Sequence, residues 1–274
     1  MKNQHTPLPK KLERSFRKKF ISPVQDIINT YRRRNYPKVF GNSIPKAGTH
    51  LLCQIFLNMG FKNKNASVGG PNCSMSLEEI EQKMKLLEKE EILYGHRHFE
   101  EELNNILSKN KISHVLIVRD PRDVVVSLAF YLPKRPEQKD FPDIQNLSQH
   151  ERLMACIKGI DDTIDLPSIG KRYEDYIPWL NDDNCLVIKF EDLIGSHGGG
   201  DDEKQLETLR RITEHVGISF GERELKEIAS KTFNERSATF RKGQIGDWAN
   251  WLDDEMLDTL KKDREIFAKF GYSI

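Results

Sequence analysis

The sequence predicts an α/β fold: a single domain with a central parallel β-sheet flanked by helices. Short runs of apolar and β-branched residues alternate along the chain with longer segments that have the apolar spacing of amphipathic helices. A strand followed by a helix, repeated, requires crossovers that cover both faces of a parallel sheet. Ligands bind such sheets beyond the carboxyl ends of the strands, so the residues that follow each strand are candidates for function.

The expected elements follow this alternation in order. Strands are expected at residues 38–44, 92–95, 114–118 and 185–190, and helices between them at residues 49–59, 77–88, 100–108, 123–131 and 148–158. Ser76 and Glu79 have the spacing of a capping box, which marks the start of the second helix. The last third is richer in helix, at residues 203–216, 222–230 and 254–270, and residues 132–146 and 195–202 are expected to be long loops.

The balanced net charge of +1 hides two unlike parts of the chain. Residues 1–38 carry 11 Lys and Arg against two acidic residues, which leaves 32 basic and 40 acidic residues for the rest. We therefore predict a basic amphipathic helical leader at residues 1–37 and one domain at residues 38–274. The leader either packs on the domain with its cations solvated or makes peripheral contact with an anionic surface.

Composition excludes several classes of protein. The chain has 37% hydrophobic and 31% charged residues, no apolar run long enough to span a bilayer and no signal-like N-terminus. The four cysteines are scattered without a C-x-x-C pair, so neither a zinc site nor a disulfide framework is indicated. A reducing, cytoplasmic location is expected, and nothing points to a nucleic-acid partner.

The first segment with chemical potential is residues 43–52, SIPKAGTHLL, where a strand runs through a turn into a helix. Lys46, Gly48 and Thr49 would supply a cation, a flexible backbone and a hydroxyl beside the N–H groups of a helix start, which together form a phosphate cradle. The segment is not a Walker A motif, because Lys46 precedes Gly48. A purely structural turn is the alternative.

A second segment, residues 114–127, reads HVLIVRDPRDVVVS and predicts a buried strand followed by a helix that starts at a proline. Arg119 at the strand end is placed to bind an anion through two N–H groups, and Ser127 is placed to donate its hydroxyl to the same ligand. The alternative is a surface pair of Arg119 with Asp123 and a solvated serine.

A third segment, residues 240–250, reads FRKGQIGDWAN. Its two glycines and two cations suggest a loop whose backbone closes over an anion. An exposed turn between helices is the alternative.

Together the three segments resemble the sulfotransferases that use 3′-phosphoadenosine 5′-phosphosulfate (PAPS). PKAGT at residues 45–49 is similar to the family's P-K-[SA]-G-T, RDPRDVVVS at 119–127 to R-[ND]-P-[RK]-D-x-x-x-S, and RKGQIGDW at 241–248 to R-K-G-x-x-G-D-W. FEDL at 190–193 is similar to Y-E-D-L. The resemblance implies the P-loop-like sulfotransferase fold, PAPS as the donor and no metal.

The resemblance also implies site residues. Lys46 would stabilise charge on the leaving phosphate oxygen and would hold the 5′-phosphosulfate with Ala47, Gly48, Thr49 and His50. The remaining donor contacts would come from Arg119, Ser127, Arg241, Lys242 and Gly243 at the 3′-phosphate, and from Thr232 and Phe233 near the adenine.

A general base is expected at the end of the second strand, in ILYGHRH at residues 92–98. The family's base lies in a similar strand-end segment, I-x-K-T-H-L-P, which matches His96, and His98 is the second candidate. A metal pair or solvated imidazoles are the alternatives. Glu100, Glu101 and Glu102 would raise the pKa of a neighbouring histidine if they approach it.

The chain departs from the family at several positions. A lysine that precedes the base in many cytosolic members is Tyr94 here, a tryptophan after the phosphate turn is Leu51, and the dimer motif after Trp248 is missing. We therefore expect a divergent branch of the family, with a bacterial branch as one alternative, and we do not infer the dimer.

The expected function is transfer of a sulfuryl group to a hydroxyl, or alternatively an amine, of a small-molecule acceptor. The apolar and aromatic residues Phe61, Tyr131, Phe141 and Phe240 favour such an acceptor. The other hypotheses are an inactive PAPS-binding scaffold and an ATP-dependent, kinase-like enzyme. A hydrolase is disfavoured, because HGGG at 197–200 is not accompanied by a G-x-S-x-G elbow.

Overall fold

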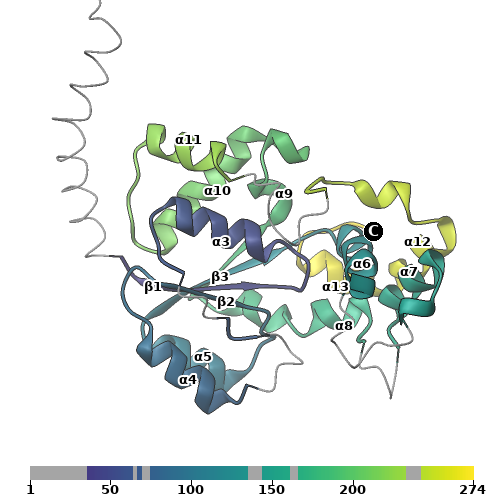
Figure 1. The fold of residues 1–274 in the computed structure, drawn as a ribbon, viewed down its shortest axis with the longest axis horizontal. Coiled ribbons are helices and arrows are strands. Elements are labelled where there is room, and N and C mark those ends of the chain that lie inside the picture. Colours follow the sequence, from purple (N-terminus) through teal and green to yellow (C-terminus); the bar gives the residue numbers. More distant parts are fainter. Residues whose placement is uncertain (1–35, 64–66, 70–74, 135–143, 161–165, 233–241) are drawn as a thin grey trace, which may run out of the picture.

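The central sheet positions the site. The computed structural model describes residues 36–63, 67–69, 75–134, 144–160, 166–232 and 242–274. Four parallel strands lie in the order β2-β1-β3-β4 (Figure 1). They are β1 (Lys38–Ser43), β2 (Ile92–Gly95), β3 (Ile112–Val118) and β4 (Cys185–Lys189). The predicted α/β fold and its parallel sheet are therefore confirmed.

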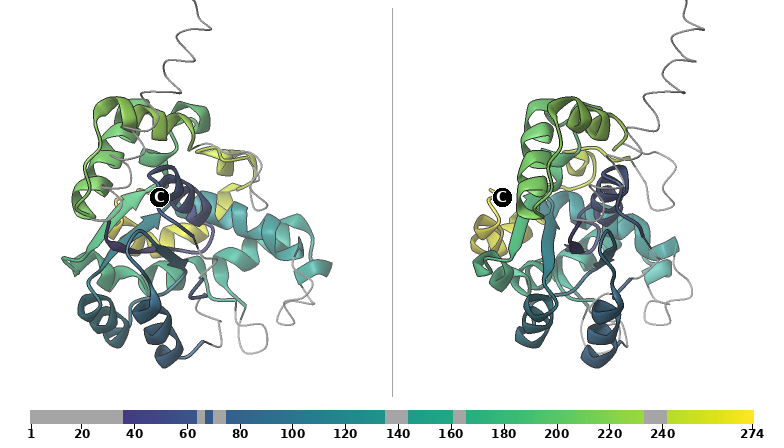
Figure 2. Two further views of the ribbon diagram at one scale, coloured as in Figure 1. Left: turned by 60° about the vertical axis from the view of Figure 1, so that its left-hand side comes forward. Right: turned by 90° about the vertical axis from the view of Figure 1, so that its left-hand side faces the viewer.

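Helices cover both faces of the sheet because successive strand residues point to opposite sides. Val115 and Ile117 of β3 face one apolar cluster, and Leu116 and Val118 face another. The first cluster is closed by α3 (Thr49–Asn58), α9 (Phe190–Leu193), α10 (Asp202–His215) and α11 (Glu222–Ser230). The second is closed by helices that include α4 (Leu77–Leu86), α5 (Glu101–Lys109) and α8 (Ile169–Glu174). Figure 2 shows α10 and α11 at one end of the molecule and α4 and α5 at the other.

A further group of helices extends the second cluster beyond the carboxyl end of β3. It consists of α6 (Pro121–Tyr131), α7 (Gln149–Lys158) and α12 (Asp254–Leu260), which lie together at one side of Figure 1, and of α13 (Arg264–Lys269) beside α8. Helix α6 starts as its sequence predicts, with Asp120 as the N-cap and Pro121 at the first position. This start fixes the direction in which the chain leaves β3.

Most predicted elements agree with the observed ones within about three residues, and the Ser76–Glu79 capping box is present. The single helix expected at residues 254–270 is wrong, because a 3-10 segment, η7 (Lys261–Asp263), separates α12 from α13. Helix α8 and the 3-10 helix η4 (Ile177–Asn181) were not expected. The stretch at 195–202 is not an open loop throughout, since it contains the 3-10 turn η5 (Ser196–Gly198).

Tyr36, the first residue that the structure describes, packs into the core of the domain. The Tyr36 hydroxyl donates to the carbonyl of Met59 at 2.8 Å, and its ring stacks on Phe61 with centroids 4.8 Å apart. Phe61 is thus a buried core residue rather than part of an acceptor pocket. The predicted leader helices lie outside the described residues. Within the described residues, no helix is both long and apolar enough to cross a membrane.

Candidate active site

Three of the predicted segments meet at one edge of the sheet. In the strand order β2-β1-β3, β1 lies between its two partners, and Asn42 of β1 is level with Gly95 of β2 and Leu116 of β3. The chain continues from these strand ends into the Lys46 turn, the His96 segment and the Arg119 turn. The residues that follow the strands therefore gather where parallel sheets bind ligands.

The turn between β1 and α3 has an unusual backbone. Lys46 has a φ of 71° and Gly48 a φ of 118°, both in the left-handed region. A Cβ atom at Gly48 would lie 2.8 Å from Cδ2 of Phe190 and 3.1 Å from Cδ1 of Ile117, so the turn packs too closely for any side chain there. Gly48 is also the N-cap of α3 and offers no side-chain cap to the first-turn N–H groups. The turn therefore presents backbone donors at a helix start, as an anion site requires.

Two cationic or titratable side chains of this turn face the same region. The Lys46 ammonium lies 3.7 Å from the centroid of the Tyr131 ring, at the end of α6. Partial loss of solvent and the nearby Lys46 charge lower the pKa of His50. The structure thus brings together the predicted residues of the phosphate cradle and places Tyr131 beside them.

His96 is held as a neutral imidazole with a defined tautomer. Its Nδ1 atom lies 3.0 Å from the carbonyl oxygen of Ser43 and 2.9 Å from the Ser43 hydroxyl. Because a carbonyl can only accept, Nδ1 carries the proton, which leaves the lone pair on Nε2. Burial lowers the pKa of His96 to about 4, and the charges of Lys46 and His50 act in the same direction. A neutral imidazole with a basic Nε2 is the form that accepts a proton.

Ser43 also connects His96 to the phosphate turn. Its hydroxyl lies 2.6 Å from the Thr49 hydroxyl, and its carbonyl accepts from the Tyr176 hydroxyl at 3.2 Å. Ser43 is fully buried. The base candidate and the first turn of α3 are therefore fixed to one residue at the end of β1.

The chain that follows His96 is anchored by contacts that the sequence did not reveal. Asn42 donates to the carbonyl of Arg97 at 2.8 Å and accepts from its N–H at 2.9 Å, and Trp179 donates to the same carbonyl at 3.2 Å. Arg97 also pairs with Glu100 at 2.5 Å. The one signal in the sequence that could have indicated these contacts is Asn42 itself, a polar residue within the apolar run of β1.

His98 has a different environment. Its Nε2 atom lies 3.8 Å from the Glu100 carboxylate, and about a third of its side chain is exposed. Glu100 thus approaches His98 and Arg97 rather than His96. The described residues contain no group of three His, Cys, Asp or Glu side chains able to hold a metal ion.

Arg119 and Asp123 form a pair, but the predicted surface location is wrong. The guanidinium is 3.5 Å from the carboxylate, Asp123 is fully buried, and Arg119 is only 10% exposed. Arg119 also donates to the carbonyl of Gln244 at 2.8 Å and lies over the Phe190 ring at 4.3 Å. Its Nε atom is buried without a hydrogen-bond partner among the described residues. Such an unpartnered donor fits a site that takes up an anion.

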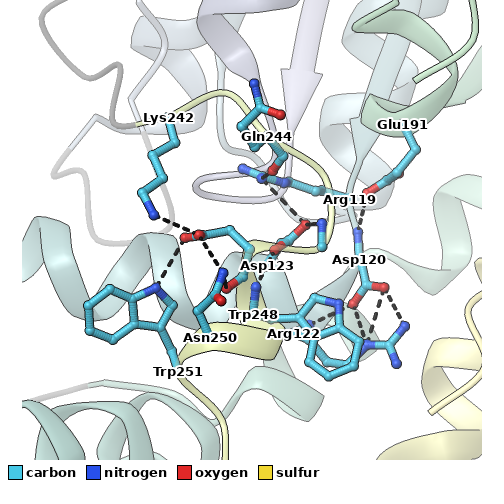
Figure 3. A network of polar contacts seen from close by, with 12 residues as sticks. Arg119, Asp120, Arg122, Asp123, Glu191, Lys242, Gln244, Trp248, Asn250 and Trp251 are labelled. Carbon is cyan, nitrogen blue, oxygen red and sulfur yellow. Dashed lines mark hydrogen bonds and ion pairs between the residues drawn. The ribbon is translucent and has the colours of Figure 1, made fainter. Parts of the chain in front are cut away.

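The third segment folds over Arg119, as Figure 3 shows. Asp123 accepts from the N–H of Gly246 at 2.9 Å and from the N–H of Trp248 at 3.1 Å. Lys242 donates to Asp247 at 2.8 Å. Because Gly246 has a φ of 76°, the loop turns at a position suited to glycine. We refer to residues 242–248 as the glycine loop.

The HGGG stretch supports this loop rather than forming a separate site. Ile245 donates through its N–H to the carbonyl of Gly198 at 3.0 Å, and the side chain of Gln244 donates to the carbonyl of His197 at 3.0 Å. A Cβ at Gly198 would lie 2.7 Å from the carbonyl oxygen of Gly243. The glycines therefore allow two backbones to approach closely.

The turn between β3 and α6 is held from a further side by residues that the sequence analysis missed. Glu191 accepts from the N–H of Asp120 at 2.8 Å and from the hydroxyl of Tyr272 at 2.9 Å. The Tyr173 hydroxyl donates to the carbonyl of Arg119. Burial raises the pKa of Glu191. The FEDL resemblance singled out the segment that contains Glu191, but nothing in the sequence pointed to the two tyrosines.

Of the remaining predicted residues, some are described by the structure and others lie outside the described residues. Ser127 is half-buried in α6, one helical turn after Asp123 and on the same face. Thr232 is buried and bonds back to the carbonyl of Ile228 at 2.8 Å. Phe233 and Arg241, like the acceptor candidates Phe141 and Phe240, lie outside the described residues.

These features define a class: α/β proteins with a candidate site for an anionic ligand at the carboxyl edge of a parallel sheet. Comparison with known proteins agrees. The family model described as a sulfotransferase domain matches residues 37–235. The chain therefore belongs to the sulfotransferase domain family.

Individual relatives are distant. The chain is 21% identical to sulfotransferase 6B1 of Danio rerio over 183 residues, which are 58% of this chain and 55% of that protein. It is 27% identical to cytosolic sulfotransferase 16 of Arabidopsis thaliana over 175 residues, 52% of this chain and 46% of that protein. The chain thus spans about half the length of the curated relatives it matches.

Two solved structures share the fold. Mouse sulfotransferase SULT7A1, complexed with PAP, superimposes with a TM-score of 0.62 at 20% identity and covers 86% of this chain and 89% of its own. Retinol dehydratase, in complex with androsterone and the inactive cofactor PAP, gives a TM-score of 0.56 at 14% identity, with coverage of 86% and 81%.

Proposed function

We propose that this protein transfers a sulfuryl group from PAPS to a hydroxyl group of a small-molecule acceptor. The observation that carries the proposal is a neutral His96, protonated on Nδ1, beside the Lys46 turn at the sheet edge. A base and a cation next to a phosphate cradle are what in-line group transfer from a phosphate ester needs. Of the four aromatic residues that suggested a small-molecule acceptor, Tyr131 is the one that the structure describes at the site, where its ring contacts Lys46.

The residues present fit the donor. The first turn of α3 and Lys46 would hold the 5′-phosphosulfate end, since the N-cap Gly48 leaves the backbone N–H groups uncapped. Arg119, with its buried unpartnered Nε, would hold the 3′-phosphate together with Ser127 and the glycine loop. Arg241, Thr232 and Phe233 are assigned to the donor by the family resemblance alone.

The reaction assigns one role to each group. When bound, PAPS supplies the sulfuryl group and leaves as 3′-phosphoadenosine 5′-phosphate (PAP). His96 accepts the proton of the acceptor hydroxyl on Nε2 as that oxygen forms its bond to sulfur. Lys46 stabilises the charge on the phosphate oxygen whose bond to sulfur breaks. Ser43 keeps the imidazole in the required tautomer through its carbonyl.

Two other functions compete with this one. A catalytically inactive PAPS-binding scaffold would need no oriented, neutral histidine beside the lysine. An ATP-dependent enzyme would have no use for a second anion subsite at Arg119. The structure therefore supports sulfuryl transfer better than either alternative.

The donor assignment is tested by thermal stabilisation. PAP at 100 times its dissociation constant is expected to add about 2.7 kcal/mol to the free energy of unfolding. ATP at the same concentration should give a smaller shift, and a larger shift with ATP would refute the donor assignment. Turnover is tested with labelled PAPS and a panel of phenols, aliphatic alcohols and amines. Transfer to none of them while PAP still binds would favour the inactive scaffold.

A further inference from the structure

Asp123 lies at the centre of the contacts between the Arg119 turn and the glycine loop. It is at the third position of α6, and its side chain is fully buried. One carboxylate oxygen accepts from Gly246 at 2.9 Å and the other from Trp248 at 3.1 Å. The first oxygen is also 3.5 Å from the guanidinium of Arg119. Figure 3 shows Asp123 between the arginine and the loop.

This arrangement opposes simple charge attraction. A carboxylate beside the arginine cancels part of the positive charge that an incoming phosphate would meet, which weakens anion binding. A buried carboxylate is retained at low cost only when hydrogen bonds satisfy it, and here two backbone N–H groups and the arginine do so. The carboxylate therefore contributes geometry rather than charge.

The loop that Asp123 holds carries Lys242 and Gly243, which the family resemblance assigns to the donor. Lys242 is bonded to Asp247 within the loop, and the carbonyl of Gln244 accepts a hydrogen bond from Arg119. Because Asp123 contacts both the arginine and two N–H groups of the loop, it fixes the distance between them. By contrast, the Lys46 turn is built on Ser43, Phe190 and Ile117, and none of its described contacts involves Asp123.

We propose that Asp123 is a positioning residue that assembles the 3′-phosphate half of the donor site, and that it thereby determines selectivity for nucleotides that carry this phosphate. The inference rests on the proposed function. It assigns Asp123 to one half of the site: the 5′ half lies on β1 and α3 and the 3′ half on α6 and the glycine loop, and although both halves contact Phe190, only the 3′ half contacts Asp123. Loss of Asp123 then affects recognition of the 3′-phosphate and spares the 5′ end.

The test compares PAP with adenosine 5′-phosphate, which lacks the 3′-phosphate, by titration calorimetry on the full chain. Asp123→Asn keeps the size of the side chain but turns an N–H donor toward backbone N–H groups. Losing one charge-assisted hydrogen bond of this kind is expected to weaken PAP binding about tenfold or more. Binding of adenosine 5′-phosphate should stay within about twofold, and the KM for PAPS should rise with little change in kcat.

Glu91→Gln is the matched control. Glu91 is also a buried carboxylate that accepts from a backbone N–H, that of Glu88 at 2.9 Å, but it precedes β2 at the opposite edge of the sheet. Its replacement should leave the ratio of the two affinities unchanged. If Asp123→Asn does not fold, Asp123→Ser removes the carboxylate without presenting an amide donor to Gly246.

The outcomes separate this inference from the proposed function. Unchanged PAP binding in the Asp123 variants, or an equal loss for both nucleotides, would overturn the positioning role while leaving the donor assignment intact. A wild-type protein that binds PAP no more tightly than adenosine 5′-phosphate would overturn the donor assignment itself, and the positioning role with it.

Discussion

Replacing His96 by glutamine is expected to remove the general base while leaving donor binding intact. With a pKa lowered to about 4, the imidazole is neutral at pH 7 and is therefore in the form that can accept a proton. A positioned general base accelerates proton transfer by about 10² to 10⁴. The substitution should therefore lower kcat by that factor, which corresponds to about 3 to 5 kcal/mol of activation free energy.

The assay measures initial rates at pH 7 with saturating PAPS and an acceptor from the panel, together with the thermal shift produced by PAP. His98→Gln is the control, because His98 is partly exposed and 3.8 Å from Glu100 rather than fixed to the phosphate turn. It should retain nearly full turnover. The reasoning fails if His96→Gln keeps more than about a tenth of the native kcat, or if the His98 variant is the one that loses activity.

Three further substitutions have defined expected results. Lys46→Met should lower kcat about 10²- to 10³-fold, measured at saturating PAPS, because it removes the cation beside the leaving oxygen. The same change should raise the pKa of His96 in an NMR titration, since the Lys46 charge lowers it. Gly48→Ala should destabilise the fold by about 1 to 3 kcal/mol in urea unfolding, because its Cβ would meet Phe190 at 2.8 Å and its φ is 118°. His114 is buried, and burial lowers its pKa from 6.5 to about 3 in the folded state. Its contribution to stability is therefore intact above pH 6.5 and is lost as the pH falls toward 3. Between pH 8 and 5 the native protein should lose about 2 kcal/mol of unfolding free energy through His114. The fall in unfolding free energy over this range should be smaller by that amount in His114→Phe, and an identical fall in the two proteins would contradict the assignment.

The fold could be predicted from sequence because its elements are locally encoded. The strand at 92–95 and the helix at 222–230 have the predicted bounds, since apolar periodicity and flanking polar residues mark both ends. The helix at 254–270 failed because the apolar spacing continues through Lys261–Asp263, where the chain tightens to a 3-10 turn. The periodicity of apolar residues predicts which face of a helix is buried, but it does not distinguish an α-helical turn from a 3-10 turn.

The candidate site could be predicted only in part. Lys46, His96 and Arg119 stand directly after strands, so the topology brings them to one edge whatever the details of packing. The supports of those residues come from distant parts of the chain. Tyr272 reaches Glu191, and Asp123 reaches the N–H groups of the glycine loop, through contacts that no local pattern encodes. Sequence reasoning therefore placed these candidate residues at one edge of the sheet and missed the residues that hold them.

Several of these supporting residues lie beyond the end of the family match. The sulfotransferase family model ends at residue 235, yet Gln244, Gly246 and Tyr272 bond to the turn that carries Arg119, directly or through Asp123 and Glu191. The part of the chain beyond the match thus packs on the turn that carries Arg119.

Two cations of the candidate site are paired with carboxylates, which bears on how an acidic domain would hold the highly anionic donor proposed for it. Arg119 faces Asp123, and Lys242 faces Asp247, so carboxylates offset the charge of these two cations before a ligand binds. Attraction at long range is then weak, and affinity must come from hydrogen bonds that are already aimed when the ligand arrives. An anion that lacks the matching geometry gains little from such a site, because the cations it would meet are already satisfied by carboxylates. Under the proposed function, selection for PAPS over other nucleotides would follow from where Asp123 holds Arg119 and the glycine loop, rather than from the number of positive charges.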